Sequence, residues 1–518
     1  MRTEHSLKNI TISIFSQVVI VLLGFLSRKV FLDSLGANYL GVNGLLTNVL
    51  SIMALVEGGI GISIVYNLYK PLAENDRNKI IALVQLYKKA YGILAILILI
   101  ISIVLYPFLG NLMKDSSPVS YLSIIYILFV AKNMISYLNA HKWSLINADQ
   151  RGYMLARTNL IIQIITMIAR IILLLLTQNY ILYLVVELLF FALQNIINGR
   201  IVNKRYPYIK TKVKYSADKE TIDRLVINVK AMFLHNIGGY LVFGTDNILI
   251  STFVNVATVG IYSNYTMITQ QVSALVKPIL GGIGDSVGNL IATESKEKNY
   301  SVFKVSYLVN FWLYALCVVF LYNLLEPFIS WWLGKQYLLN HLTLIFILVN
   351  FYLDGMRTAI STYKNKAGLF VQDKYAPLIE GGINLISSII LVKYYGIAGI
   401  IMGTTISTIA TVLWTQPYIV YKHLFKEPVL TYFIKYLFYL GLTIFACFVT
   451  TSICDYLDVG TKFISLVIRG IICLIIPNIL FVLILYKTNE FKYFNGLVNL
   501  TLTRVKMKFK KTKYEYDL

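Results

Sequence analysis

Arginine, amide and carboxylate side chains recur at helical spacing within long apolar stretches of this chain. Steps of three, four, seven or eleven residues keep side chains on one face of a helix. Asn159, Gln163 and Arg170 lie on one such stripe, and Gln17 and Arg28 are eleven residues apart on another. A charged group that faces hydrocarbon costs at least about 2.5–3.5 kcal/mol at mid-membrane. The stripes therefore indicate a shared interior that is hydrated or mutually paired.

The basic members of these stripes have the chemistry of an anion-binding site. A guanidinium group offers a planar fork of donors that matches phosphate or carboxylate. Buried basic candidates in the first half of the chain are Arg28, Lys132 and Arg170, which suits an anionic group such as a phosphate. We predict a substrate-binding cavity for such an anionic group, lined by Arg28, Arg170, Lys132, Arg357, Gln17, Gln163 and Asn159.

Acidic groups outnumber basic ones among the buried candidates of the second half, and these could carry protons or sodium. The candidates for a coupling-ion or gating role are Asp246, Asp354, Glu57, Asp285 and His235. Alternatives stay open, because small and polar residues also serve helix packing in membranes. Asp354 and Arg357, three residues apart, could satisfy one another, which would be a structural role. A single histidine such as His235 is more often a packed, hydrogen-bonded residue than a ligand.

Motifs of several enzyme classes are absent from the sequence. There is no GxxxxGK[ST] phosphate loop, no HExxH, and no Cys/His spacing typical of a metal site. The longest segment between apolar stretches is too short for a catalytic domain. We therefore predict a transporter rather than an enzyme, without metal or cofactor, whose energy comes from a proton or sodium gradient or from the membrane potential.

The stripes require many membrane-spanning helices to carry them. Of 518 residues, 57% are hydrophobic and 14% charged, against about 45–50% and about 25% in soluble domains. This composition excludes a soluble enzyme, a disordered chain and a collagen-like fibre. A spanning helix needs roughly 20 mostly apolar residues, and the sequence offers fourteen such stretches. The predicted spans are 10–32, 41–69, 83–109, 119–140, 153–177, 181–202, 225–250, 258–291, 304–327, 339–361, 377–394, 396–421, 431–454 and 462–487.

The net charge of +22 is distributed unevenly along the chain. Lys and Arg concentrate in every second loop, whereas the intervening loops hold few, Lys114 and Lys335 among them. Because basic loops stay cytoplasmic, we predict a multi-pass protein with both termini inside, and the charge needs no nucleic acid to explain it. The basic linker 203–224 and the basic tail 488–518 are expected to lie against anionic lipid.

Internal similarity predicts two lobes. EGGIGISIVYNL (57–68) resembles LGGIGDSVGNL (280–290), and these segments follow Gly41 and Gly260 at nearly equal distances. ADQRGY (148–153) and VQDKY (371–375) match loosely in the same register. A repeat of six spans gives two parallel lobes with the site between them. We predict an all-α membrane protein with a first lobe (1–202), the linker 203–224, a second lobe (225–421), two accessory helices (422–487) and the tail 488–518.

Several segments carry a resemblance to a known family. They are GTDNILISTFVNVATVGIYSNYTMI (244–268), LGANYLGVNGLLTNVLSIMALVEGGIG (35–61), NADQRGY (147–153), WWLGKQYLL (331–339) and NKAGLFVQDKYAPLIEGGINLISSIILVKYYGIAGIIMGTTIS (365–407). Over residues 5–430 the chain resembles Wzx-type flippases, the polysaccharide transporter branch of the multidrug/oligosaccharidyl-lipid/polysaccharide exporter superfamily. The motifs are similar to those of Gram-positive capsule and surface-polysaccharide flippases.

The resemblance implies an activity in the bacterial cytoplasmic membrane. The substrate would be an undecaprenyl-diphosphate-linked oligosaccharide repeat unit, moved from the inner to the outer leaflet by alternating access without ATP. It implies contact with membrane lipids and suggests a polysaccharide polymerase and other assembly proteins as partners. Cavity charges vary within the family, so no residue receives a fixed role. Alternatives are a lipid II-type flippase, a multidrug exporter of the same superfamily, a membrane glycosyltransferase or polymerase, and a structural scaffold.

Overall fold

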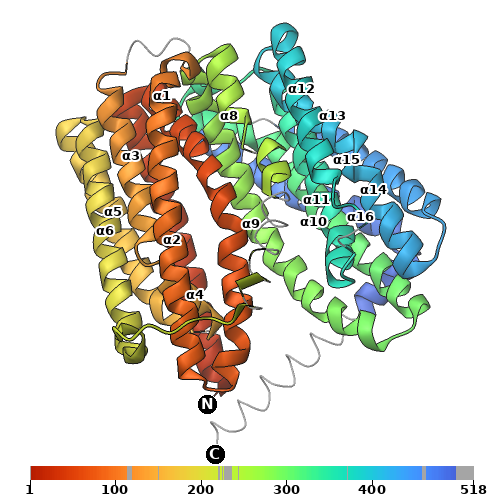
Figure 1. Ribbon diagram of the computed structural model, residues 1–518. Coiled ribbons are helices and arrows are strands. Elements are labelled where there is room, and N and C mark those ends of the chain that lie inside the picture. Colours follow the sequence, from red (N-terminus) through yellow and green to blue (C-terminus); the bar gives the residue numbers. More distant parts are fainter. Residues whose placement is uncertain are drawn as a thin grey trace, which may run out of the picture. The chain divides into compact units, whose positions relative to one another are not determined.

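The computed structural model describes residues 2–113, 119–149, 151–219, 222–223, 226, 236–242, 244–369, 372–457 and 462–496. It gives the backbone alone for residues 2–18, 53–56, 58–64, 66, 278, 281–286, 289, 292 and 462. These described parts are helical, with no β-strand among them (Figure 1). An all-α chain is therefore confirmed.

The first helices correspond to the predicted spans with one difference. Helix α1 (Arg2–Ala73) contains the predicted spans 10–32 and 41–69 and is interrupted at Gly36, whose φ of 79° is left-handed. Glycine adopts this conformation at no steric cost, so the chain changes direction there between two helical segments. Helix α2 (Arg77–Leu105) begins at Asp76, whose side chain accepts a hydrogen bond from the Lys79 backbone N–H.

The next four helices include an unexpected one. Helices α3 (Leu122–Tyr137) and α4 (Ala140–Ala148) meet at an angle of 44°. Most of the predicted loop 141–152 is therefore helix, with buried residues such as Leu145 and Ile146. Helices α5 (Tyr153–Thr177) and α6 (Tyr180–Arg205) agree with the predicted spans 153–177 and 181–202. The Asn179 side chain caps α6 by accepting from two backbone N–H groups of its first turn.

The remaining helices continue to residue 485. They are η1 (Tyr106–Phe108), η2 (Gly110–Leu112), η3 (Pro207–Lys210), α8 (Asp246–Leu249), η4 (Ile250–Val254), α9 (Val256–Thr293), α10 (Lys296–Trp332), η5 (Lys335–Tyr337), α11 (His341–Lys366), α12 (Ala376–Tyr395), α13 (Ile397–Ala410), α14 (Val412–Val420), η6 (Tyr421–Phe425), α15 (Leu430–Tyr456) and α16 (Lys462–Leu485). Each predicted span after residue 250 coincides with one helix, or with the consecutive helices α13, α14 and η6.

Contacts divide the chain into two compact units. The first comprises Met1–Ser263 and Asn384–Ile400, and the second comprises Asn264–Ile383 and Ile401–Leu518. These units do not test the boundaries predicted for the two lobes. In the second unit, α10, α11, α15 and α16 pack around aromatic residues. Phe311 and Tyr439 stack there, with ring centroids 4.2 Å apart.

Two glycines allow a close helix contact within the first unit. A Cβ added to Gly41 of α1 would lie 1.8 Å from the Val256 carbonyl oxygen, and one added to Gly260 of α9 would lie 2.2 Å from the Ala37 carbonyl oxygen. Small residues permit such backbone approach in membrane helices. The two glycines that the sequence singled out as related positions therefore both lie at the contact between α1 and α9.

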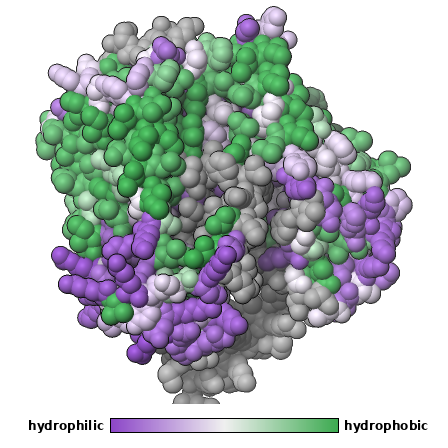
Figure 2. Space-filling view, viewed as in Figure 1, coloured by the Kyte–Doolittle hydropathy of each residue, from purple (hydrophilic) through white to green (hydrophobic). Residues whose placement is uncertain are grey.

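Within the described residues, nine helices are long and apolar enough to cross a membrane, or eleven if each of two bent pairs forms one span. The predicted count of fourteen stays a prediction. Figure 2 shows a hydrophobic surface over α2, α5 and α6 of the first unit, and a hydrophilic one around the end of α6 and η3. Exposed apolar residues of α2 and α5, such as Ile93 and Leu176, fit a lipid-facing surface. The chain is thus a multi-pass membrane protein.

Ion pairs hold both accessory helices. Arg469 of α16 pairs with Asp455 of α15 at 3.2 Å. After α16, Glu490 pairs with Lys435 of α15. Burial alone would raise the pKa of Glu490, but the hydrogen bond and the charge of Lys435 outweigh burial and hold that pKa below its ordinary value. The segment after α16 is therefore attached to α15 by a charged contact.

Candidate functional site

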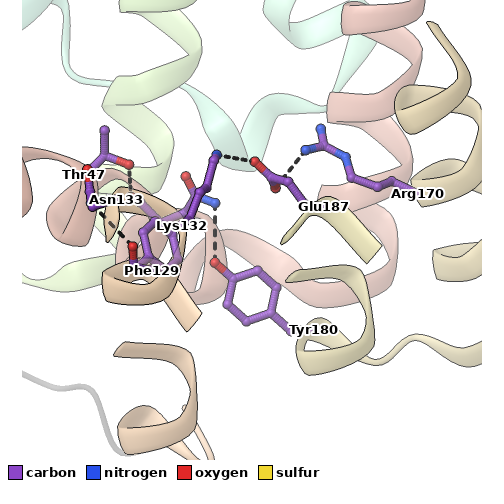
Figure 3. A network of polar contacts seen from close by, with 8 residues as sticks. Thr47, Phe129, Lys132, Asn133, Arg170, Tyr180 and Glu187 are labelled. Atoms are coloured by element: carbon purple, nitrogen blue, oxygen red, sulfur yellow. Dashed lines mark hydrogen bonds and ion pairs between the residues drawn. The ribbon is translucent and has the colours of Figure 1, made fainter. Parts of the chain in front are cut away.

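Three charged side chains from three helices of the first unit meet at one point (Figure 3). Glu187 of α6 accepts from Lys132 of α3 at 2.5 Å with one carboxylate oxygen and from Arg170 of α5 at 2.7 Å with the other. The side chains of Arg170 and Glu187 are 18% and 19% exposed, and that of Lys132 is 40% exposed. Partial burial makes these charge-assisted contacts stronger than surface ion pairs.

Amide side chains continue the site along α5 and α6. Asn159 of α5 accepts from Gln194 at 2.8 Å and from Asn198 at 2.6 Å, both on α6. Eleven residues separate Asn159 from Arg170, and eleven separate Glu187 from Asn198, as two antiparallel helices in register require. At about 1.5 Å per residue, this polar track covers roughly 16 Å. The predicted stripe of α5 therefore faces a second polar stripe on α6, formed by Glu187, Gln194 and Asn198.

Aromatic rings pack against the charged end of the polar track, at Arg170. The Arg170 guanidinium carbon lies 4.5 Å from the centroid of the Tyr183 ring, a cation–π contact. Tyr183 packs in turn against Phe31 of α1 and against Tyr180. Tyr183 and Glu187 are four residues apart on α6, so the cap at Asn179 helps to set the position of both. These contacts fix the guanidinium plane of Arg170 against the wall of the site.

Two cavities adjoin the charged residues. The larger, of about 280 Å³, is lined by Lys132, Asn159, Gln163, Thr166, Met167, Arg170, Glu187, Phe191 and Gln194. The smaller, of about 50 Å³, is lined by Asn43, Thr47, Leu128, Phe129, Lys132, Leu184, Glu187 and Leu188. Lys132 and Glu187 line both cavities, whereas Arg170 lines only the larger one. Four predicted site residues, Lys132, Asn159, Gln163 and Arg170, thus line one cavity.

Arg28 of α1 lies near this cluster. Its guanidinium donates to the Ser263 hydroxyl at 2.8 Å, and it is within electrostatic range of Arg170 and Tyr183. Within the described part of the chain, Arg28 pairs with no carboxylate. Lys132 and Arg170 therefore share one carboxylate, Glu187, and Arg28 nearby adds a positive charge with no carboxylate partner among the described residues.

Asp354 and Arg357, two predicted residues of the second unit, pair with one another. Arg357 donates to Asp354 at 2.9 Å and lies 3.7 Å from Glu380. The Asn350 side chain donates to the Ile401 carbonyl and accepts from the Thr405 hydroxyl. The structure thus contains the ion pair between Asp354 and Arg357 that the spacing suggested, and it adds Glu380.

The remaining candidates are dispersed. Glu57 accepts a hydrogen bond from the Tyr137 hydroxyl at 2.9 Å. Asp246 begins α8, and its Oδ1 is buried without a hydrogen-bond partner among the described residues. The side chains of Gln17 and Asp285 and the whole of His235 lie outside the described residues. The roles assigned to all these residues stay predictions.

Five residues that line the larger cavity were not predicted to belong to the site, namely Thr166, Met167, Glu187, Phe191 and Gln194, and neither was Tyr183 beside Arg170. Glu187 lies on a polar stripe with Gln194 and Asn198, and this stripe was the signal for it. Tyr183 had no signal, because a tyrosine in an apolar helix is usually a packing residue. No group of metal-binding side chains occurs in the described parts of the chain.

Comparisons with known proteins concern the family and the fold. A family model described as "Polysaccharide biosynthesis protein" matches residues 6–283, whereas a search of curated proteins finds no match. The solved structure of the lipid II flippase MurJ in an inward closed conformation has a TM-score of 0.64 and 15% identity, covering 92% of this chain and 99% of that one.

Two further solved structures are similar. An inward-facing multidrug resistance MATE family transporter has a TM-score of 0.53 and 15% identity, covering 77% of this chain and 94% of that one. A MOP superfamily transporter from Pyrococcus furiosus has a TM-score of 0.51 and 14% identity, covering 80% and 94%. At these identities the likeness concerns the fold. The solved structures that share this fold are a flippase and two transporters, and the fold is consistent with the predicted transporter.

Proposed function

The chain belongs to the polysaccharide biosynthesis protein family, and from this premise we propose that it is a flippase for undecaprenyl-diphosphate-linked oligosaccharide repeat units. The observation that carries the proposal is the cavity between α3, α5 and α6, where charged and amide side chains line one wall. The site lies in the part of the chain that the family model matches.

Charge supports a diphosphate as the anchoring group. Arg28, Lys132 and Arg170 together with Glu187 leave two positive charges in excess in this cluster. Each phosphate of a diphosphate diester carries one negative charge, so a lipid-linked sugar diphosphate would balance the cluster. Arg170 can present its planar fork to phosphate oxygens, and its Nε has no hydrogen-bond partner among the described residues.

The amide end of the track supports a sugar as the neighbouring group. Asn159, Gln163 and Gln194 line the cavity together with the ring of Phe191. Amides both donate and accept hydrogen bonds, which suits sugar hydroxyls. A polar head cannot cross about 30 Å of hydrocarbon unaided, whereas its polyprenyl tail can stay in lipid. A track of roughly 16 Å would shield the head along part of this path.

The proposal places the chain in the bacterial cytoplasmic membrane with both termini inside, which the basic loops support. Transport would proceed by alternating access without ATP. A membrane potential that is negative inside favours outward movement of an anion by about 2.3 kcal/mol per charge per 100 mV, and a proton or sodium gradient is the other source of energy.

Depletion of the protein in the bacterium that carries its gene tests the proposal. We expect lipid-linked repeat units to accumulate in the membrane while labelled sugar nucleotide is still incorporated into them, because only translocation is lost. Lost incorporation would instead indicate a glycosyltransferase. Re-expression should clear the accumulated lipid. Rescue of a strain that lacks its lipid II flippase would favour the peptidoglycan precursor as substrate.

A further inference from the structure

We propose that Glu187 is an internal anion that holds the diphosphate position of the empty site and is displaced by the substrate. This inference rests on the proposed function and adds a residue that sets binding strength and release. Its basis is the position of one carboxylate between two cations (Figure 3), and this carboxylate belongs to a residue that lines the larger cavity.

The first step is that Glu187 already binds both cations in the empty site. One carboxylate oxygen of Glu187 forms an ion pair with Lys132, and the other forms an ion pair with Arg170. Phosphate oxygens bind the same donors in the same way. A substrate anion therefore cannot engage both cations while Glu187 keeps both, so binding must exchange one anion for another.

The second step is the space available to the displaced carboxylate. The smaller cavity of about 50 Å³ is lined by Lys132 and Glu187 but not by Arg170, and Asn43 and Thr47 supply polar groups there. A polar cavity of this size can hold water. Glu187 can turn into it and stay paired with Lys132, while Arg170 becomes available to the substrate. The carboxylate thus moves without becoming an unpaired buried charge, which would be costly.

The third step is the consequence for release. With Glu187 present, the cluster has two excess positive charges, which match a diphosphate diester. Without it, the excess is three, and no internal anion competes for Arg170 when the substrate leaves. The substrate should bind more tightly and leave more slowly, since affinity differences between related complexes lie mostly in the dissociation rate.

Binding of an undecaprenyl-diphosphate-linked sugar, which is a diphosphate diester, to the full chain in lipid nanodiscs tests this inference. We expect Glu187→Gln to bind about tenfold more tightly than the wild type, which corresponds to about 1.4 kcal/mol, and to show a lower maximal transport rate in vesicles. Asp33→Asn is the matched control, because Asp33 forms an exposed ion pair with Lys29 in the same unit; it should bind like the wild type.

Each outcome of these binding measurements either supports or overturns a specific claim. Binding by Glu187→Gln that equals or falls below that of the wild type overturns the inference and makes Glu187 a structural partner of its two cations. If that variant does not fold, Glu187→Asp keeps the charge but is one methylene shorter, and it too should bind more tightly than the wild type; weaker binding overturns the inference. If the folded wild type binds the undecaprenyl-diphosphate-linked sugar no better than undecaprenyl monophosphate, the proposed function fails instead, separately from the role of Glu187.

Discussion

Replacing Arg170 by glutamine removes a positive charge from the proposed site and leaves a shorter polar side chain. Two contacts of the folded state disappear: the 2.7 Å hydrogen bond to Glu187 and the cation–π contact with Tyr183. Lys132 still pairs with Glu187 after the change. The carboxylate is therefore not left alone.

These contacts set the expected magnitudes. Removing one partner of a buried ion pair costs about 3–5 kcal/mol. Because Lys132 remains and the Arg170 side chain is 18% exposed, we expect a loss of unfolding free energy of roughly 1–3 kcal/mol. A hydrogen bond to a charged group contributes about 1.5–3 kcal/mol, so undecaprenyl diphosphate should bind roughly 10- to 150-fold more weakly.

The assay measures both quantities on the same nanodisc sample, by thermal melting and by titration with undecaprenyl diphosphate. Arg170→Lys keeps the charge but lacks the planar fork, so it should recover stability more completely than binding. The reasoning is refuted if Arg170→Gln melts at a lower temperature but binds within twofold of the wild type. Arg170 would then stabilise the helix contact and take no part in binding.

Three further predictions concern other parts of the chain. Arg28→Gln should weaken diphosphate binding several-fold with little change in melting temperature, because Arg28 has no carboxylate partner among the described residues; a large loss of stability would contradict this. Gly41→Ala should lower the unfolding free energy by about 1–3 kcal/mol, because its Cβ would overlap a backbone carbonyl, whereas Gly92→Ala, with nothing within 4 Å, should not. The ion pair of Lys435 and Glu490 should stabilise the segment after α16 fully at pH values above 4.5, the ordinary pKa of Glu490. This stabilisation should be lost as the pH falls through the lowered pKa that Glu490 has in the folded state. Proteolysis of residues 486–496 should therefore increase at low pH in the wild type, and it should be pH-independent in Glu490→Gln.

Helical periodicity accounts for the parts of the site that were predictable. The spacing of Asn159, Gln163 and Arg170 placed them on one face of a helix, and the structure places that face against the stripe of α6. Span ends were predictable where a polar or capping residue interrupts the apolar stretch, as at Asn179. The residue types also indicated an anion-binding wall, because arginine and amides share it.

Tertiary contacts explain what the sequence could not provide. Lys132 and Glu187 are 55 residues apart, and no local rule pairs them. Helix α4 was not predicted, because its segment contains polar and basic residues. It is buried against α1, α2 and α3, and this burial outweighs its local composition. The contact between Gly41 and the backbone of α9 likewise depends on packing between distant segments, although both glycines were visible as related positions.

Translocation by the purified full chain in proteoliposomes is the most direct test of the proposed flippase activity. A fluorescent undecaprenyl-diphosphate-linked oligosaccharide is placed in one leaflet, and its appearance in the other leaflet is followed without ATP. We predict that the wild type accelerates this transfer and that Arg170→Gln reduces the acceleration at least tenfold. Transfer by the folded wild-type protein that is no faster than in protein-free vesicles would contradict the proposed function.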